Sequence, residues 1–282
     1  MTRVIDFRVT LPLSEFAPHT AVGEDEAAYL GNYERVYTQG FGAGGVEQMV
    51  ADMDGAGIER AVLQAEWGFG DYRAMNAAVI RISREHPDRF IPYVTVNPAE
   101  DDDMAAVVQR EVTDNGARGV NLQPFAYRLH CDDRRFYPLY DVCSDLGVPV
   151  TVHCSVNFSA DRPIEFGRPL HLDQVACDFP SLTLIANHGG WPWVTEMVAV
   201  AWKHPNVYVE LGAISPKYIA RPGTGWEPLL VYGRSLLQDR VLWATDCMLP
   251  FARSLAEARQ LPLPPAVIDK WLGLNAARLL GV

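Results

Sequence analysis

The sequence lacks the long apolar segments that a membrane span requires. No run of about 18 or more apolar residues occurs, although 49% of the 282 residues are hydrophobic. The first residues, Met1 to Asp6, lead almost directly into a strand pattern and show none of the charged, apolar and small-residue regions of a secretion signal. We therefore expect a cytoplasmic protein that has no membrane partner.

Positive charge is also scarce. Lysine and arginine together number 24 against 35 aspartates and glutamates, which gives a net charge of −11 at pH 7. Nucleic-acid binding needs a basic surface, so we expect no nucleic acid as a partner. A small anionic substrate stays compatible with this charge, because one arginine inside a site outweighs distant surface charges.

The cysteines do not form any Cys-x-x-Cys pair. They are Cys131, Cys143, Cys154, Cys177 and Cys247. An odd number of cysteines in a chain without a secretion signal indicates reduced thiols. Cys154 and Cys247 lie beside candidate site residues, but neither has the neighbours of a nucleophile, and we interpret both as packing residues.

A glycine-rich phosphate loop is missing after the first predicted strand, which argues against a doubly wound nucleotide-binding sheet. Instead, short apolar runs alternate with helical patterns, as expected for parallel strands that helices cover. The predicted strands are Val4–Thr10, Arg60–Glu66, Phe90–Asn97, Gly119–Gln123, Val148–Cys154, Leu182–Asn187, Val207–Glu210 and Arg240–Thr245. This pattern predicts an α/β fold, a (β/α)8 TIM barrel in which residues 1–282 form a single domain.

Glycines and loops fit this barrel. Gly57, Gly116 and Gly147 each precede a predicted strand, where a helix ends with a C-cap glycine. The two longest loops, Leu11–Gly45 and Ser155–Pro169, follow strands and lie on the side of the barrel where they could cover a site. The tail from Pro264 to Val282 predicts one or two closing helices.

Polar side chains gather where the predicted strands end. The members of this ring are Asp6, Arg8, Thr10, Gln64, Glu66, Thr95, Asn97, Asn121, Gln123, Thr151, His153, Ser155, Asn187, His188, Tyr208, Glu210, Thr245 and Asp246. Buried polar groups are costly unless they are hydrogen-bonded or functional. The carboxyl ends of barrel strands are also where catalysis occurs, so we expect the active site there.

The first strand shows the alternation that places this ring. Side chains alternate along a strand, so every second residue faces the barrel interior. We expect Asp6, Arg8 and Thr10 to point inward near the top of the barrel. Ile5, Phe7 and Val9 are then expected to meet the surrounding helices.

Several segments together resemble the amidohydrolase-related family, including decarboxylases similar to aminocarboxymuconate semialdehyde decarboxylase. The segments are His86–Phe90, Gly116–Val120, Gly147–His153, Asn187–Gly190, Trp243–Asp246 and Asn275–Leu280. The resemblance runs nearly end to end, and this order and spacing are specific for the family. It implies a metal-dependent barrel enzyme, and a homodimer is the assembly common among such barrels.

The chain departs from the family at its metal-binding motif. Members begin with Asp-x-His-x-His, and here Asp6 is followed by Arg8 and Thr10 in place of the histidines. The resemblance assigns the other two ligand positions to His153 and Asp246, and the position of a general acid or base to His188. Arginine stays protonated and cannot bind a metal, and two ligands fall short of a usual catalytic site.

Two interpretations of the metal follow. The site either has no metal, with Arg8 replacing its charge, or holds one weakly bound divalent ion, zinc or manganese. In the second case His153, His188 and Asp246 would form a remodelled centre. In the first case Arg8 would grip a substrate carboxylate or carbonyl oxygen, and Asp246 would pair with Arg8 or serve as a base.

These residues predict an enzyme that acts on a small carboxylated, aromatic or cyclic substrate. We assign catalytic roles to Arg8, His188 and Asp246. The residues expected to contact substrate are Arg8, Thr10, Glu66, Gln123, His153, Trp191 and Glu210.

The reaction remains open between hydrolysis of a lactone, ester or amide and loss of CO2. In the hydrolase version Asp246 or His188 activates water, and Arg8 stabilises the oxyanion. In the decarboxylase version Arg8 orients the carboxylate, and His188 or Asp246 delivers a proton. The alternative from another class is a non-catalytic relative that only binds a small ligand.

Overall fold

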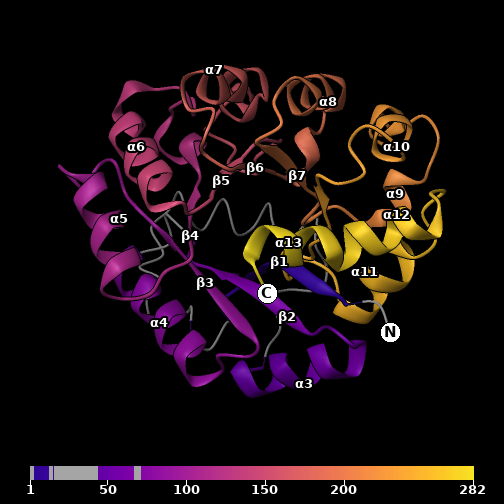
Figure 1. The fold of residues 1–282 in the computed structure, drawn as a ribbon, viewed down its shortest axis with the longest axis horizontal. Helices are drawn as coiled ribbons and strands as arrows, with labels where there is room; N and C mark the ends of the chain where they lie inside the picture. The colour runs from indigo at the N-terminus through magenta and orange to yellow at the C-terminus, as the bar shows by residue number, and fades with distance from the viewer. Residues whose placement is uncertain (1–2, 13–14, 16–43, 67–70) are drawn as a thin grey trace.

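Eight parallel strands form one sheet in sequential order, from β1 to β8 (Figure 1). The computed structural model describes residues 3–12, 15, 44–66 and 71–282. The strands are β1 (Ile5–Thr10), β2 (Arg60–Gln64), β3 (Phe90–Thr95), β4 (Gly119–Leu122), β5 (Val150–His153), β6 (Leu184–Asn187), β7 (Val207–Glu210) and β8 (Val241–Leu242). The predicted TIM barrel is confirmed. Most of the predicted loop Leu11–Gly45 lies outside the described residues.

The sheet closes on itself between its first and last strands. The backbone N–H of Phe7 donates to the carbonyl of Trp243 at 3.1 Å, and the N–H of Asp246 donates to the carbonyl of Arg8 at 2.8 Å. These bonds continue the β8 side of the seam beyond Leu242. Strand β8 itself ends at Leu242, so it is shorter than the predicted Arg240–Thr245.

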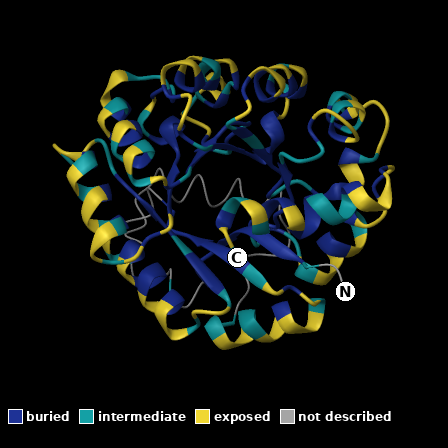
Figure 2. Ribbon diagram, viewed as in Figure 1, coloured by how far each residue is buried: buried dark blue, intermediate teal, exposed yellow. Residues whose placement is uncertain are grey.

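Helices surround the barrel, with their outer faces exposed and the strands buried (Figure 2). They are α3 (Val46–Ala56), α4 (Tyr72–Glu85), α5 (Met104–Thr113), α6 (Tyr137–Leu146), α7 (Leu170–Asp178), α8 (Val194–Lys203), α9 (Pro216–Ile219), α10 (Glu227–Gly233), α11 (Phe251–Ala258), α12 (Pro265–Asp269) and α13 (Asn275–Leu280). No helix in the described ranges is both long and apolar enough to cross a membrane.

The helix ends follow the expected local chemistry. Gly57 and Gly147 end α3 and α6 with φ of 77° and 67°, the left-handed conformation that glycine adopts without strain. Gly116 has a φ of 84° between α5 and β4. Helix α4 begins after Asp71, whose carboxylate accepts hydrogen bonds from two backbone N–H groups of the first turn. The predicted C-caps at Gly57 and Gly147 and the closing helices α12 and α13 are thus confirmed, whereas the C-cap of α5 is Asp114, two residues before Gly116.

The lower barrel interior holds Ile5 and Phe7, so the prediction that they face the helices was wrong. They pack in one cluster with Val62 and Ile185 of β2 and β6, and with Ala276 of α13. Strands that are not neighbours meet only across the interior, and α13 crosses that end of the barrel (Figure 1).

A bulge in β1 explains this error. The register of β1 on β2 shifts between Asp6, opposite Ala61, and Val9, opposite Leu63. A bulge interrupts the alternation of side chains, so the adjacent residues Phe7 and Arg8 both point inward. Val9 packs outside with Met53 of α3, as predicted.

The substitution Gly119→Ala should destabilise the barrel. A Cβ at Gly119 would lie 2.4 Å from the ring of Tyr93, which is fully buried on the neighbouring strand. We expect a loss of about 1–3 kcal/mol of unfolding free energy from this overpacking, measured by urea denaturation.

The matched control is Gly55→Ala on the exposed face of α3, where a new Cβ meets nothing within 4 Å. This variant should be unchanged or more stable by up to about 1 kcal/mol, because alanine is the better helix former. Equal stability of Gly119→Ala and the wild type would contradict the packing argument.

Candidate active site

The Arg8 side chain lies inside the barrel and ties several strands together. It is 2% exposed. Its Nε donates to Asp246 Oδ1 at 2.6 Å, and its Nη2 donates to Glu66 Oε1 at 2.6 Å. Its Nη1 donates to Gln64 Oε1 at 2.7 Å and to Asn121 Oδ1 at 3.3 Å. The guanidinium thus links β1 to β2, β4 and the segment after β8.

Two further polar groups complete this cluster from β6 and β7. The Asn187 amide is oriented with its oxygen toward Arg8 and its nitrogen toward Glu210. The oxygen then accepts a hydrogen bond from Arg8 Nη1 at 3.1 Å, and the nitrogen donates to Glu210 Oε2 at 3.2 Å. The other oxygen of Glu210 accepts from the backbone N–H of Gly212. Glu210 is fully buried, so it lies within the polar core of the barrel.

Asp6 lies at the seam between the first and last strands. Its Oδ1 accepts from the backbone N–H of Arg8 at 3.1 Å and of Thr245 at 2.9 Å. Its Oδ2 accepts from the Thr245 hydroxyl at 2.6 Å. Asp6 therefore fixes the backbone on both sides of the Arg8–Asp246 ion pair.

The carboxyl groups around Arg8 have raised pKa values because they are buried. Burial raises the pKa of Glu210 to about 8 against the opposing charge of Arg8, and burial raises the pKa of Asp6 to about 7. Burial also raises the pKa values of Glu66 and Asp246, and again Arg8 opposes the shift. Several acids thus face one fixed cation, and part of them can hold a proton near neutral pH.

Burial and the same cation keep the two histidines neutral. Burial and the Arg8 charge lower the pKa of His188 to about 3, and burial lowers the pKa of His153 well below its ordinary value. A neutral His188 donates from Nδ1 to the Gly212 carbonyl at 2.9 Å, which leaves its Nε2 with a lone pair. His153 Nε2 lies 3.2 Å from the Ser155 carbonyl, so its Nδ1 carries the lone pair. The ring centroids of the two histidines are 4.9 Å apart.

The backbone is strained at the two residues expected to do chemistry. His188 and Asp246 have φ of 65° and 57°, in the left-handed region that residues with a side chain rarely adopt. Such conformations cost about 1–3 kcal/mol each and cluster at functional sites. Both residues lie just after the carboxyl ends of their strands, His188 after β6 and Asp246 after β8.

The two carboxylate oxygens of Asp246 differ in their hydrogen bonds. Its Oδ1 accepts from Arg8 Nε, whereas its Oδ2 accepts no hydrogen bond from the part of the chain that the structure describes. His188 Nδ1 lies 4.0 Å from Oδ2. Asp246 is 5% exposed, so a small part of its surface reaches solvent.

The expected metal ligands do not fit a divalent ion. A metal centre needs three or more donor atoms close together, and among the described residues His153, His188 and Asp246 are not such a group. A fixed cation, Arg8, already bonds Asp246 Oδ1.

The other predicted site residues lie at different distances from this cluster. Gln123 donates from Nε2 to Glu66 Oε2, so the structure brings both to the Arg8 cluster. Trp191 is 38% exposed, and its Nε1 donates to the Thr224 carbonyl at 3.3 Å. Neither Trp191 nor Thr10 has a recorded contact with Arg8 in the described ranges.

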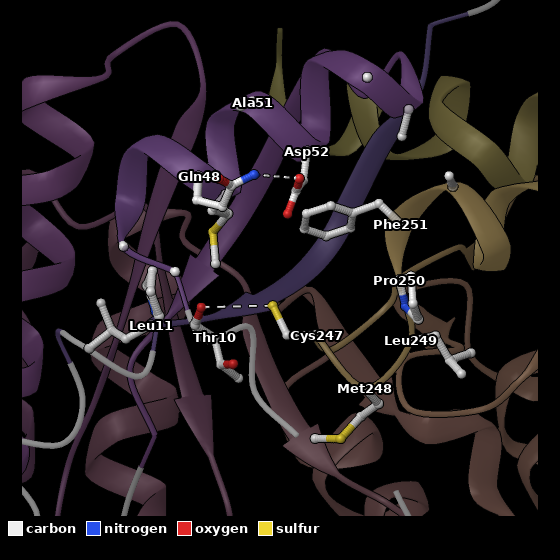
Figure 3. Close-up of a pocket in the computed structure, with 17 residues that line it drawn as sticks. Thr10, Leu11, Gln48, Ala51, Asp52, Cys247, Met248, Leu249, Pro250 and Phe251 are labelled. Carbon is white, nitrogen blue, oxygen red and sulfur yellow. Dashed lines mark hydrogen bonds between the residues drawn. The ribbon is translucent and has the colours of Figure 1, made fainter. Parts of the chain in front are cut away.

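Thr10 instead lines a cleft between α3 and α11 (Figure 3). The cleft has a volume of about 520 Å³ and also includes Gln48, Cys247 and Phe251. The Cys247 thiol lies 3.9 Å from the Thr10 carbonyl.

Three residues of the cluster, Gln64, Asn121 and Asn187, had been given no role. Gln64 and Asn121 belong to the predicted ring of polar strand ends, and both accept from Arg8 Nη1. The signal was their position, two residues before Glu66 and Gln123 on the same face of β2 and β4.

A sequence model of the amidohydrolase family matches residues 17–282. The chain belongs to the amidohydrolase family. This confirms the resemblance seen in the sequence and the prediction of a family whose enzymes include hydrolases and carboxy-lyases. A comparison with curated proteins finds no match to this amidohydrolase.

Solved structures share the whole fold of this amidohydrolase. An uncharacterised TIM-barrel protein from Bordetella bronchiseptica is 30% identical, with 99% of this chain and 98% of that chain covered and a TM-score of 0.81. A 5-carboxyvanillate decarboxylase from Novosphingobium aromaticivorans with bound manganese is 16% identical, with 99% and 97% covered and a TM-score of 0.71. A 2,6-dihydroxybenzoate decarboxylase from Rhizobium is 18% identical, with 100% and 99% covered and a TM-score of 0.70.

The substitution Arg8→Met should destabilise this amidohydrolase strongly. Removing one partner of a buried ion pair leaves uncompensated charge, and we expect a loss of about 3–5 kcal/mol at neutral pH. Arg81→Met is the control, because Arg81 pairs with Glu15 and Glu85 on the surface and exposed pairs contribute about 0–1 kcal/mol. Urea denaturation measures both, and equal losses would show that the Arg8 pairing is unimportant.

Glu210 should contribute to the pH profile of wild-type stability a component that falls as pH rises from about 4.5 to about 8. Glu210 has a folded pKa of about 8, above the ordinary value of 4.5, so the folded state binds more protons in this window. Its contribution to stability is complete below the lower value and is lost as pH rises through the upper one.

Glu210→Gln should flatten this profile, since an amide does not titrate. Glu85→Gln, at an exposed position, should leave the slope unchanged. Urea midpoints taken between about pH 5 and about pH 8.5 measure the slopes. A Glu210→Gln slope equal to that of the wild type would rule out Glu210 as its source.

Proposed function

We propose that this chain is a hydrolase of the amidohydrolase family that uses Asp246 as general base and needs no metal in the barrel. Its substrate is a small carboxylated, aromatic or cyclic lactone, ester or amide. The observation that carries the proposal is the difference between the two oxygens of Asp246: Arg8 Nε donates to Oδ1 at 2.6 Å, whereas Oδ2 accepts no hydrogen bond from the residues that the structure describes.

The proton-accepting groups support hydrolysis. Besides Asp246 Oδ2, the neutral rings of His188 and His153 each present one unprotonated nitrogen. Such a set of acceptors suits the binding and deprotonation of water. Asp246 Oδ2 takes a proton from water as its oxygen attacks the carbonyl carbon, and returns that proton to the leaving oxygen or nitrogen.

The role of Arg8 changes in this proposal from the one expected from sequence. Its bonds to Asp246, Glu66, Gln64 and Asn121 leave it buried and occupied, so a grip on the substrate carboxylate is not what its contacts favour. Arg8 is a positioning residue. Its charge favours the ionised form of Asp246, which can accept a proton, while burial raises the pKa of that carboxyl group.

The substrate class rests on the solved relatives and on the aromatic surroundings. The relatives named above include decarboxylases of 5-carboxyvanillate and 2,6-dihydroxybenzoate, which are small carboxylated aromatic compounds. In this chain the Phe125 ring lies 4.4 Å from the ring of His153, and the partly exposed Trp191 follows β6. These groups suit a flat ring.

Decarboxylation is the second candidate, and one observation favours it. Glu66 is 8% exposed, and burial raises its pKa, so a protonated carboxyl group is available beside the site. Replacing CO2 on a carbon needs such a proton donor. A ligand-binding protein without catalysis is the third candidate, and the backbone strain at His188 and Asp246 argues against it.

The Asp246→Asn variant separates these candidates. We expect it to lower kcat on a hydrolysed substrate by about 10²–10⁴-fold, the usual contribution of a general base. The assay panel contains carboxylated lactones, esters and amides, with 2,6-dihydroxybenzoate and 5-carboxyvanillate as decarboxylation substrates. Proton release reports ester and lactone hydrolysis, detection of the free amine reports amide hydrolysis, and evolved CO2 reports decarboxylation.

Glu66→Gln is the matched variant, because it changes the other carboxylate bonded to Arg8. Loss of CO2 release in Glu66→Gln, with no hydrolysis in the wild type, would replace the hydrolase proposal with the decarboxylase. Binding of panel compounds without turnover in the wild type would support the ligand-binding protein. Full hydrolytic activity of Asp246→Asn would refute its role as base.

A further inference from the structure

Helices α7 and α8 bring three metal-ligating side chains together on the outside of the barrel. Asp173 and Cys177 are four residues apart on α7, so they lie on one face of that helix. His204 directly follows α8, where its backbone N–H donates to the Val200 carbonyl. The two helices lie side by side around the barrel (Figure 1).

The donor atoms of these residues are already close to metal-binding distances. His204 Nε2 lies 2.7 Å from Asp173 Oδ1 and 4.0 Å from Cys177 Sγ. All three donor atoms lie within 4.8 Å of one another, and no other set of three in the described chain does so. Zinc bond lengths in a tetrahedral site imply separations of about 3.3 Å for N···O and about 3.6 Å for N···S.

A cation already occupies the edge of this group. Lys203 Nζ lies 2.7 and 3.0 Å from the two Asp173 oxygens and 3.6 Å from Cys177 Sγ. The Lys203 side chain is 54% exposed, so its ammonium can swing into water. The surroundings therefore stabilise positive charge at these donors, and the charge now there can be displaced.

We propose that Asp173, Cys177 and His204 bind one soft divalent cation of the zinc class. Thiolate, imidazole and carboxylate together select such ions rather than magnesium or calcium. On binding, the Cys177 thiol releases its proton to solvent, the Lys203 ammonium leaves, and water completes the fourth position. The thiolate and carboxylate together balance the charge of the ion.

This site is separate from the carboxyl ends of the strands, where Arg8 lies. His204 is three residues before β7 begins, and α7 ends shortly before β6 begins. Both therefore lie at the end of the barrel where strands start. Catalysis in a TIM barrel takes place at the opposite end. The bound ion would therefore act by joining α7 to α8 and stabilising the fold.

Zinc titration of the wild type after treatment with a chelator tests the proposal. We expect one equivalent to bind and to raise the thermal unfolding midpoint. Cobalt at the same site should give a thiolate-to-cobalt charge-transfer absorption. Of the five cysteines, all within the described ranges, Cys177 is the exposed one. Its alkylation by iodoacetamide, read by peptide mass spectrometry, should slow at least about tenfold in zinc.

Three variants test the assignment of ligands. Cys177→Ser and Asp173→Asn should abolish the stoichiometric binding, and the first should also remove the cobalt absorption. Asp132→Asn is the matched control, because Asp132 pairs with His171 at 3.0 Å, at similar exposure and with no thiol. It should bind zinc as the wild type does. Unchanged binding by Cys177→Ser, or no stoichiometric binding by the wild type, overturns the proposal.

Lys203→Met tests the exchange without removing a ligand. The loss of the competing ammonium should tighten zinc binding by about tenfold, and weaker or unchanged binding contradicts the exchange step. The metal content of Cys177→Ser then reports on the barrel alone. Zinc that persists in that variant would count against the metal-free hydrolase, whereas zinc lost with Cys177 would leave that proposal intact.

Discussion

The structure depends on the burial of one permanent positive charge. An arginine cannot lose its proton in a protein, and an isolated charge inside a barrel would be very unfavourable. The Arg8 guanidinium is tolerable only because Asp246, Glu66, Gln64 and Asn121 surround it with acceptors. Those acceptors come from different strands, so the charge can be satisfied only when the barrel has closed.

The same constraint organises the acid–base properties of the site. The cluster holds more carboxyl groups than cations, and burial raises their pKa values. The Arg8 charge opposes the shifts of Glu210 and Asp246, and it lowers the pKa of His188. Asp6 holds the backbones of Arg8 and Thr245 in register, so the geometry of Asp246 follows from the way the first and last strands join.

Much of this was accessible from the sequence. The apolar runs predicted eight strands, and their polar ends predicted where Glu66, Gln123 and Asp246 would meet. The inward position of Phe7 was not accessible, because a bulge changes alternation without a local sequence signal. The hydrogen bonds of the Arg8 side chain were not accessible either, because they depend on the relative positions of the strands that carry its acceptors. The group formed by Cys177 and His204 depends on the packing of two helices, since no motif joins residues so far apart.

The replacement of two histidines by Arg8 and Thr10 in the first strand has a consequence for how the site is assembled. A charge that is part of the polypeptide is present in every molecule as soon as the chain has folded. It cannot be removed by a chelator, exchanged for a competing ion or lost when metals are scarce. The positive charge inside this barrel is therefore inherited with the gene and does not depend on the supply of metal ions.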